Sequence, residues 1–168
     1  MTLAQAYCKQ FGKVSFPFII YDSNGNETYY ENGDGYCYKV EYNSQDKETY
    51  FENSKGFWYK VEYDSNGNET YYENSKGYWF KKEYNSQGNV TYFVDNEGIW
   101  SKTEYNSQGN VTHYENSTGS WSKTEYDSNG NETYYENSAG TIRGSKKCSC
   151  NGKVVEIDGK KYKLKELK

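Results

Sequence analysis

The chain has 168 residues, of which 33% are apolar and 19% are Phe, Trp or Tyr, including 21 tyrosines. Disordered chains are poor in aromatic residues, so this composition argues against disorder and favours a fold held by aromatic and cross-strand contacts. The net charge of −4 is unevenly distributed: residues 21–140 have 21 acidic and 9 basic side chains, and both ends of the chain are basic. The acidic segment should repel nucleic acid and attract basic partners, although an acidic surface often serves solubility alone.

The first 20 residues predict a cap with one helix and one strand. Thr2 and Gln5 have the spacing of a helix N-cap and its reciprocal partner, and Gly12 can end the helix. The run from Val14 to Ile20 is typical of a strand, and its proline suits an edge because proline donates no ladder hydrogen bond. We expect residues 1–20 to cover the first edge of the fold.

Residues 21–146 predict six tandem repeats of 21 residues, the last one incomplete. The repeated phrase resembles Y-D-S-N-G-N and begins at Tyr21, Tyr42, Tyr63, Tyr84, Tyr105 and Tyr126. A fixed period without insertions is typical of a repeat architecture in which each module packs on its neighbours.

Each repeat contains two turn signals and two strand signals. The turns resemble D-S-N-G and N-S-x-G, with glycine where a three-residue hairpin loop needs a left-handed residue. The segments between them are short and rich in Tyr, Trp, Thr and Phe, as in strands. The sequence therefore predicts an all-β fold: an elongated, twisted antiparallel meander, solenoid-like, of about twelve strands.

The faces of this sheet follow from the alternation of side chains. Adjacent tyrosines such as Tyr71 and Tyr72 must point to opposite faces, so both faces carry rings. Because 21 is odd, the tryptophans change face from repeat to repeat if both turns have the same loop parity, and otherwise stay on one face. Lys60 and its equivalents are expected to lie opposite Glu73-type residues on the neighbouring strand.

Residues 147–168 predict a basic C-terminal hairpin cap. After Gly140 the sixth repeat has Thr141-Ile142-Arg143-Gly144 in place of a Trp strand. Further on, Asp158-Gly159 separates two alternating runs, which is a strong signal for a two-residue hairpin.

The best candidates for a binding site are exposed rings on rigid strands. Such rings offer a large contact area and lose little rotamer entropy on binding. The alternative interpretation is that they only hold a thin sheet together. The predicted binding residues are Trp58, Trp79, Trp100, Trp121, Tyr50, Tyr71 and Tyr92.

No pattern in the sequence predicts a catalytic, metal or cofactor site. D-S-N-G-N offers oxygen ligands, but its glycine is at the fourth position and no glutamate follows at the twelfth, so a turn is the better interpretation than a calcium loop. Cys148 and Cys150 form a C-x-C motif that is too weak to predict zinc. His113 replaces a repeat tyrosine, and no carboxylate pair stands out. We expect a protein that is not an enzyme.

Targeting signals are also missing from the pattern. No run approaches the roughly 20 apolar residues of a membrane helix, and no secretory signal precedes the first repeat. Four scattered cysteines are most simply reduced thiols. We therefore expect a cytoplasmic location.

The recurring Tyr-Asp-Ser-Asn-Gly-Asn phrase with a second Gly turn ten residues later resembles the tyrosine-aspartate (YD, or Rhs) repeat over residues 21–140. That resemblance implies β-strands that spiral into a shell around a toxin. The chain, with its Val155-to-Lys160 ending, is also similar to uncharacterised repeat proteins of tailed phages, which implies action in the cytoplasm of the host cell. Its Gly-x-Trp hairpins are weakly similar to choline-binding cell-wall repeats.

Three functions remain open at this point. The first is a protein-interaction module that binds, or binds and inhibits, a basic host protein such as a nucleic-acid-binding or defence factor. The second is a carbohydrate-binding module whose rings stack on sugars. The third is a structural spacer. Salt distinguishes the first two, because it weakens a charge-driven complex and barely affects stacking on a neutral sugar.

Overall fold

The computed structural model describes residues 2–146 and 153–163. These residues form one helix and 15 strands. The helix is α1 (Leu3–Phe11), and the strands are β1 (Phe18–Tyr21), β2 (Glu27–Glu31), β3 (Cys37–Tyr42), β4 (Glu48–Asn53), β5 (Trp58–Tyr63), β6 (Glu69–Asn74), β7 (Trp79–Tyr84), β8 (Val90–Asp95), β9 (Trp100–Tyr105), β10 (Val111–Asn116), β11 (Trp121–Tyr126), β12 (Glu132–Asn137), β13 (Ile142–Gly144), β14 (Val154–Ile157) and β15 (Lys160–Lys163).

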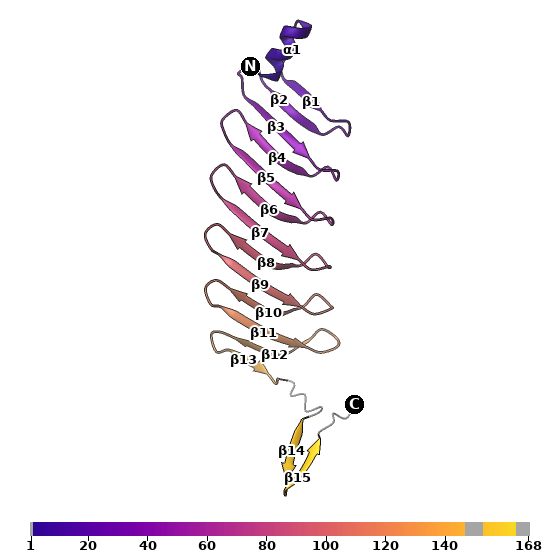
Figure 1. Cartoon of the computed structure of the whole chain (residues 1–168), viewed down its shortest axis with the longest axis vertical. Helices are drawn as coiled ribbons and strands as arrows, with labels where there is room; N and C mark the ends of the chain where they lie inside the picture. Colours follow the sequence, from indigo (N-terminus) through magenta and orange to yellow (C-terminus); the bar gives the residue numbers. More distant parts are fainter. Residues whose placement is uncertain (1, 147–152, 164–168) are drawn as a thin grey trace. The chain divides into compact units, whose positions relative to one another are not determined.

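Strands β1 to β13 form one antiparallel sheet in which every strand pairs with the next one along the chain (Figure 1). The predicted all-β meander is therefore confirmed. The chain divides into two compact units, Met1–Thr103 with Asn116–Thr118, and Glu104–Glu115 with Gly119–Lys168, which are called unit 1 and unit 2 and are described separately. No helix in the described part of the chain is long and apolar enough to cross a membrane.

Helix α1 forms for the reason that the sequence suggests. The Thr2 side chain accepts from the Gln5 backbone N–H, and the Gln5 side chain accepts from the Thr2 N–H in return. Gly12 donates its backbone N–H to the Cys8 carbonyl at the other end. The strand predicted over Val14–Ile20 is wrong at its start, because the chain bends at Phe16 and Pro17 and β1 begins only at Phe18.

A β-bulge in the first hairpin of the repeat decides which face the side chains take, and it is present in the β1–β2, β3–β4, β5–β6, β7–β8 and β11–β12 pairs. Glu62 pairs with Tyr71 and Tyr63 pairs with Glu69, so Thr70 is an extra residue on β6. The Thr70 hydroxyl donates to the Glu62 carbonyl at 3.2 Å. The second hairpin, which closes at the Glu73–Trp79 pair, has no such shift. The extra residue compensates for the odd repeat length, so the tryptophans of unit 1 stay on one face.

Neighbouring repeats are joined by hydrogen bonds outside the strand ladders. The Tyr84 hydroxyl, from the first residue of the repeat phrase, donates to the Glu69 carbonyl of the previous repeat at 2.8 Å. The backbone N–H of Ser75 donates to the Trp58 carbonyl at 2.9 Å, and the Ser75 hydroxyl accepts from the Trp58 N–H at 3.2 Å. These bonds explain why the repeat phrase keeps its first tyrosine and why the second turn of the later repeats has serine, or Asn96 in the fourth repeat, at this position.

The core of this sheet is thin. Among the described residues no large side chain is completely buried, and the buried apolar ones are Ala4, Tyr29, Val40, Val61 and Tyr134. Stability must therefore come from ladder bonds and from contacts along each face.

The C-terminal part differs from the prediction in one respect. The segment after Gly140 retains a three-residue strand, β13, which pairs with β12 through Glu136–Ile142 and its neighbours. Strands β14 and β15 pair with each other in a separate two-stranded sheet, as the Asp158-Gly159 signal predicts. Their role as a cap stays a prediction, and Cys148 and Cys150 lie outside the described residues.

Candidate protein-binding surface

In unit 1 the strand register places six of the seven predicted binding residues on one face of the sheet. Along β5, Trp58, Lys60 and Glu62 share a face, and Lys60 lies opposite Glu73, which in turn lies opposite Trp79. The same alternation continues to β9. We call this surface of unit 1 the tryptophan face, and its rings are Trp58, Trp79, Trp100, Tyr50, Tyr71 and Tyr92.

The seventh residue, Trp121, belongs to unit 2 and has the same kind of surroundings. It lies opposite Glu115, and two residues further along β11 Lys123 lies opposite His113 and Glu136. Its neighbours on this face include Tyr134, which pairs with Glu125. Unit 2 thus repeats the pattern of the tryptophan face.

Each tryptophan is held by its backbone, and its indole is half-buried. In β5, β7 and β11 the backbone N–H of the tryptophan donates to a side-chain oxygen of the residue 17 positions later. In β5, β7, β9 and β11 the backbone carbonyl of the tryptophan accepts from the backbone N–H of that same later residue. Among the described residues none of the four indole N–H groups has a hydrogen-bond partner or counts as a buried unsatisfied atom. The rings are thus fixed in place and keep an unused donor.

Lysine side chains cover part of the indole surface. The ammonium groups of Lys81, Lys102 and Lys123 lie 5.7–6.0 Å from the ring centres of the tryptophans two residues before them. This geometry is that of a cation–π contact, which is weak at exposed sites. The rings therefore do not present a bare, flat platform.

Two tyrosines of this face, Tyr50 and Tyr71, are bonded to glutamates two residues later, whereas Tyr92 is followed at that distance by Val94. The Tyr50 hydroxyl donates to Glu52 at 2.6 Å and the Tyr71 hydroxyl donates to Glu73 at 3.0 Å. Burial, followed by the Glu73 bond, raises the pKa of Tyr71, whereas for Tyr50 the bond to Glu52 is the larger cause of its raised pKa. The hydroxyls of Tyr50 and Tyr71 are therefore already bonded to carboxylates within the sheet.

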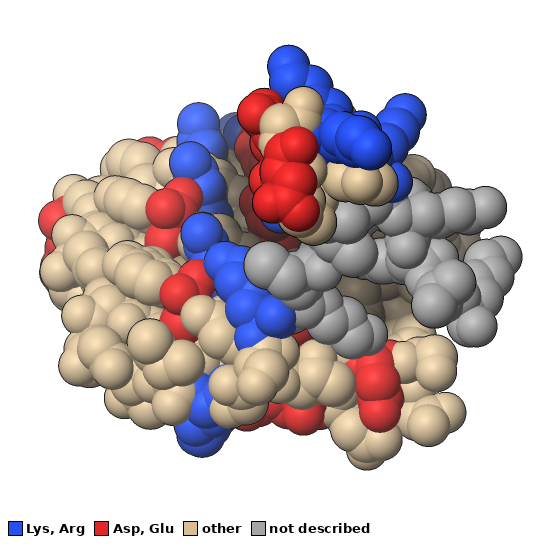
Figure 2. Space-filling model, turned by 90° about the horizontal axis from the view of Figure 1, so that it is seen from below, with Lys and Arg blue, Asp and Glu red and all other residues tan. Residues whose placement is uncertain are grey.

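Charge on the tryptophan face is mixed. Lys60 and Lys123 lie opposite Glu73 and Glu136 as expected, whereas Lys81 lies opposite Val94. Ion pairs form within a strand, from Lys39 to Glu41 and from Lys60 to Glu62, both at 2.6 Å with side chains about half exposed. Exposed pairs of this kind contribute little to stability. In the end-on view of Figure 2, several acidic side chains lie beside basic ones.

Helix α1 covers the first repeat of the tryptophan face. Glu31, only 3% exposed, accepts from the Thr2 hydroxyl at 2.8 Å, from the Ala4 N–H at 3.2 Å and from the Tyr29 hydroxyl at 2.8 Å. The Tyr7 ring packs against Phe18 at 5.4 Å. At this repeat Cys37 stands where later repeats have tryptophan, which leaves the smaller side chain beside Glu31.

The opposite face of unit 1 carries a continuous ladder of stacked rings that the sequence did not predict in this form. Successive ring centres are 5.1–6.0 Å apart, within the range of favourable aromatic pairs. We call it the stacked-ring face, and it runs through Tyr30, Tyr38, Phe51, Tyr59, Tyr72, Phe80 and Phe93.

Glutamates on the stacked-ring face bind donors that lie 11 residues later in the chain. Tyr59 donates its hydroxyl to Glu48, and Tyr38 donates in the same way to Glu27. Burial, followed by the Glu48 bond, raises the pKa of Tyr59. A sequence signal for these pairs exists, because where Val90 replaces the glutamate, Ser101 replaces the tyrosine.

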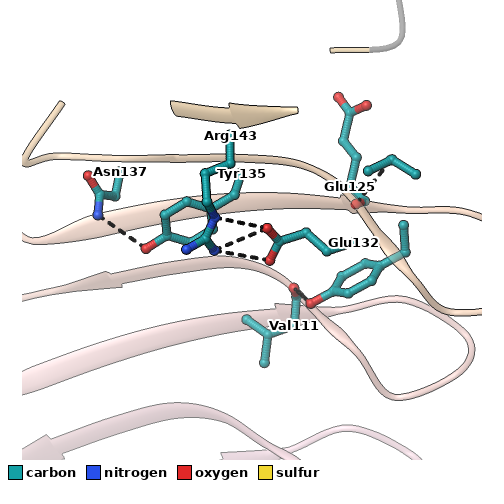
Figure 3. A network of polar contacts seen from close by, with 8 residues as sticks. Val111, Glu125, Glu132, Tyr135, Asn137 and Arg143 are labelled. Atoms are coloured by element: carbon teal, nitrogen blue, oxygen red, sulfur yellow. Dashed lines mark hydrogen bonds and ion pairs between the residues drawn. The ribbon is translucent and has the colours of Figure 1, made fainter. Parts of the chain in front are cut away.

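In unit 2 the same spacing produces an ion pair. Arg143 on β13 donates to both carboxylate oxygens of Glu132 at 3.1 and 3.2 Å, and its guanidinium lies 4.3 Å from the centre of the Tyr135 ring (Figure 3). The Tyr135 hydroxyl accepts from the Asn137 amide at 3.1 Å. This network attaches the short last strand to β12.

Unit 2 also contains a polar groove of about 700 Å³. His113 lines it together with Glu136 and Lys146, whose ammonium lies 3.8 Å from the Glu136 carboxylate and 5.6 Å from the centre of the Tyr134 ring. Among the described residues no group of three or more His, Cys, Asp or Glu side chains has the arrangement of a metal site.

Comparison with solved structures found similar arrangements in much larger toxin chains. The first is the Photorhabdus luminescens Tc holotoxin pore with a TccC3 mutation, at 12% identity and a TM-score of 0.48, where the match covers 70% of this chain and 6% of the other. The second is TcdB2-TccC3-Cdc42, at 12% identity and a TM-score of 0.49, covering 70% of this chain and 7% of the other. The third is TcdB2-TccC3-TEV, at 11% identity and a TM-score of 0.44, covering 72% of this chain and 9% of the other. The chain thus spans less than a tenth of the length of each.

The sequence comparisons add no family. No protein-family model matches the chain. The search of curated proteins found no match either. By its own repeats and sheet register the chain is a tandem β-hairpin repeat protein.

Proposed function

We propose that this protein is a non-enzymatic interaction module that binds a basic protein through the tryptophan face. The observation that carries the proposal is that six predicted binding rings, which alternate along the sequence with other aromatic residues, share one face. Rigid rings surrounded by charged side chains are typical of protein-binding surfaces. The acidic charge of residues 21–140 favours a basic partner.

The resemblance of the sequence to repeat proteins of tailed phages supports a narrower version of this proposal. In that version the protein is encoded by a phage, acts in the host cytoplasm, and binds, and inhibits, a nucleic-acid-binding or defence protein of the host. No metal or cofactor is needed for this activity.

The placement of the lysines weighs against the carbohydrate-binding alternative. Sugars stack on the open faces of indole rings, but Lys81 and Lys102 lie over the rings of Trp79 and Trp100. A protein partner can instead use the ring edges and the free indole N–H groups. Charged groups of the partner can also replace the lysine or the glutamate in the Lys–Glu ion pairs of this face.

The test is capture of partners from a lysate of a plausible bacterial host by the wild-type protein and by a Trp79→Ala, Trp100→Ala double variant. We expect the variant to lose its partner, because truncating central aromatic anchors typically costs about 2 kcal/mol or more each. The captured complex should also weaken as salt rises.

A matched control removes exposed apolar area from the stacked-ring face. Tyr78 and Ile99 are 38% and 48% exposed, and the ring contact between Tyr78 and Phe80 places Tyr78 on that face. A Tyr78→Ala, Ile99→Ala variant should keep the partner. The proposal fails if the Trp79→Ala, Trp100→Ala variant remains folded and keeps its partner. It also fails if a neutral oligosaccharide displaces the partner from the wild-type protein independently of salt.

A further inference from the structure

Four Asn-Gly pairs lie within the described residues, and they differ in whether the backbone N–H of the glycine donates a hydrogen bond. In such pairs the glycine nitrogen can attack the asparagine side-chain carbonyl, provided that this nitrogen is free. Three pairs are in the first turn of a repeat, where the glycine N–H donates to a turn carbonyl at 3.0–3.2 Å. The protected asparagines are therefore Asn24, Asn66 and Asn129.

The fourth asparagine, Asn32, begins a second turn and has a different environment. Its Oδ1 accepts from the backbone N–H groups of Asp34 and Tyr36, both at 3.0 Å. The equivalent Asn53 accepts the same two bonds at 3.0 and 3.2 Å. Two N–H donors at this distance are placed to stabilise negative charge on the oxygen, as an oxyanion hole does.

What distinguishes Asn32 from its equivalents is the amide that follows it. Ser54, Ser75 and Ser138 follow the corresponding asparagines, and their N–H groups donate at 2.8–2.9 Å to the strand that begins 17 residues earlier. At the first repeat no such strand begins 17 residues earlier, because β1 starts only at Phe18. Within residues 2–146 the Gly33 N–H has no hydrogen-bond partner.

We propose that Asn32 and Gly33 form a site of intramolecular cyclisation. The Gly33 nitrogen forms a bond to Cγ of Asn32 and loses its proton, while the Cγ–Nδ2 bond breaks and ammonia leaves. Charge that develops on Oδ1 is stabilised by the N–H groups of Asp34 and Tyr36. Water then opens the succinimide at either carbonyl, which leaves aspartate or isoaspartate at position 32.

The modification affects the contact with helix α1. Asn32 directly follows Glu31, which holds Thr2 and Ala4 at the start of the helix. Isoaspartate adds a methylene to the main chain at this point, and both products add a carboxylate. We expect the modified chains to hold α1 less firmly than unmodified chains.

The experiment incubates the folded full-length protein at mildly alkaline pH and measures conversion at each Asn-Gly pair by peptide mapping with mass spectrometry. Asn32 should convert at least about tenfold faster than Asn24, Asn66 and Asn129, because it alone combines two donors with a free nucleophile. In denaturant the four rates should converge, since the difference arises from the fold.

A Gly33→Ser variant restores the residue found at this position in later repeats. It should fold, because a Cβ at Gly33 would have only an ordinary 3.9 Å contact with Phe16. Conversion at Asn32 should fall to the level of the other pairs while theirs stays unchanged. Equal rates at all four pairs of the folded wild-type protein, or no effect of the serine, would overturn the proposal.

Discussion

At the scale of single residues, the Tyr-to-His change at position 113 shows what the repeated tyrosine contributes. Tyr134 donates its hydroxyl to Glu136 at 2.8 Å, as Tyr50 and Tyr71 do to their glutamates. His113 has Nε2 at 3.9 Å from Glu115, beyond hydrogen-bonding distance, and its buried Nδ1 has no partner among the described residues. The histidine thus leaves a buried polar atom unsatisfied.

We expect His113→Tyr to raise the free energy of unfolding by about 1 kcal/mol, because it removes the unsatisfied atom and restores a hydroxyl donor for Glu115. Denaturant titration followed by circular dichroism measures the change. His113→Phe is the control, since it fills the same space without a hydroxyl and should stabilise less. If His113→Tyr lowers the free energy of unfolding, this account of the repeated tyrosine is contradicted.

At the scale of elements, α1 depends on one buried carboxylate. The helix is too short to persist alone, so its stability must come from packing on the sheet. Its first turn is bonded to Glu31, and the Tyr7 ring contacts Phe18 further along. Figure 1 shows the helix beside the start of the sheet at β1 and β2.

Glu31→Ala should detach α1 and leave the repeats intact, because the change removes the acceptor of three hydrogen bonds. The expected cost is about 1–3 kcal/mol, and it should be confined to the helix. Hydrogen exchange of the amides of α1 measures it. The control is Glu52→Ala, because Glu52 holds the same position in the next repeat but is exposed and has no helix bonded to it. If the amides of α1 stay protected from exchange in Glu31→Ala, the prediction is contradicted.

At the scale of the whole molecule, the tyrosines make stability sensitive to alkaline pH. Burial and neighbouring carboxylates raise the pKa of nine tyrosines above the usual 10.0, and these are Tyr29, Tyr38, Tyr42, Tyr50, Tyr59, Tyr63, Tyr71, Tyr84 and Tyr134. Above pH 10 the unfolded chain loses phenol protons that the folded chain keeps. Stability should be fully present below that pH and fall as the pH rises beyond it.

We therefore expect cooperative unfolding in alkali, with phenolate absorbance and loss of β-sheet circular dichroism appearing together. A Tyr38→Phe, Tyr59→Phe variant loses two of the raised groups and should show a shallower dependence of stability on pH above 10. The chain has 21 tyrosines, so complete phenolate absorbance from all of them while the sheet signal stays intact would show that these nine hydroxyls are not protected by the fold.

The sequence by itself determined the repeat length, the strand and turn positions within residues 21–140 and the capped helix, but not the start of β1 or the presence of β13. These features are encoded locally: glycine allows the left-handed turn residue, as at Gly77 with φ of 80°, and aromatic runs of five or six residues favour strands. The 11-residue spacing of Glu48 and Tyr59 left only a partial signal, because Val90 and Ser101 replace both members of the pair together while Glu69 is kept with Phe80.

Only the tertiary structure decided which face each side chain occupies. A single extra residue moves every following side chain to the other face, and the bulge residue Thr70 has no signature that distinguishes it from an ordinary strand threonine. The docking of α1 on Glu31 likewise joins distant residues, because Glu31 accepts from Thr2 and Ala4, which lie 29 and 27 residues earlier in the chain. These outcomes depend on which residues become neighbours across strands, and the repeat pattern alone does not fix that pairing.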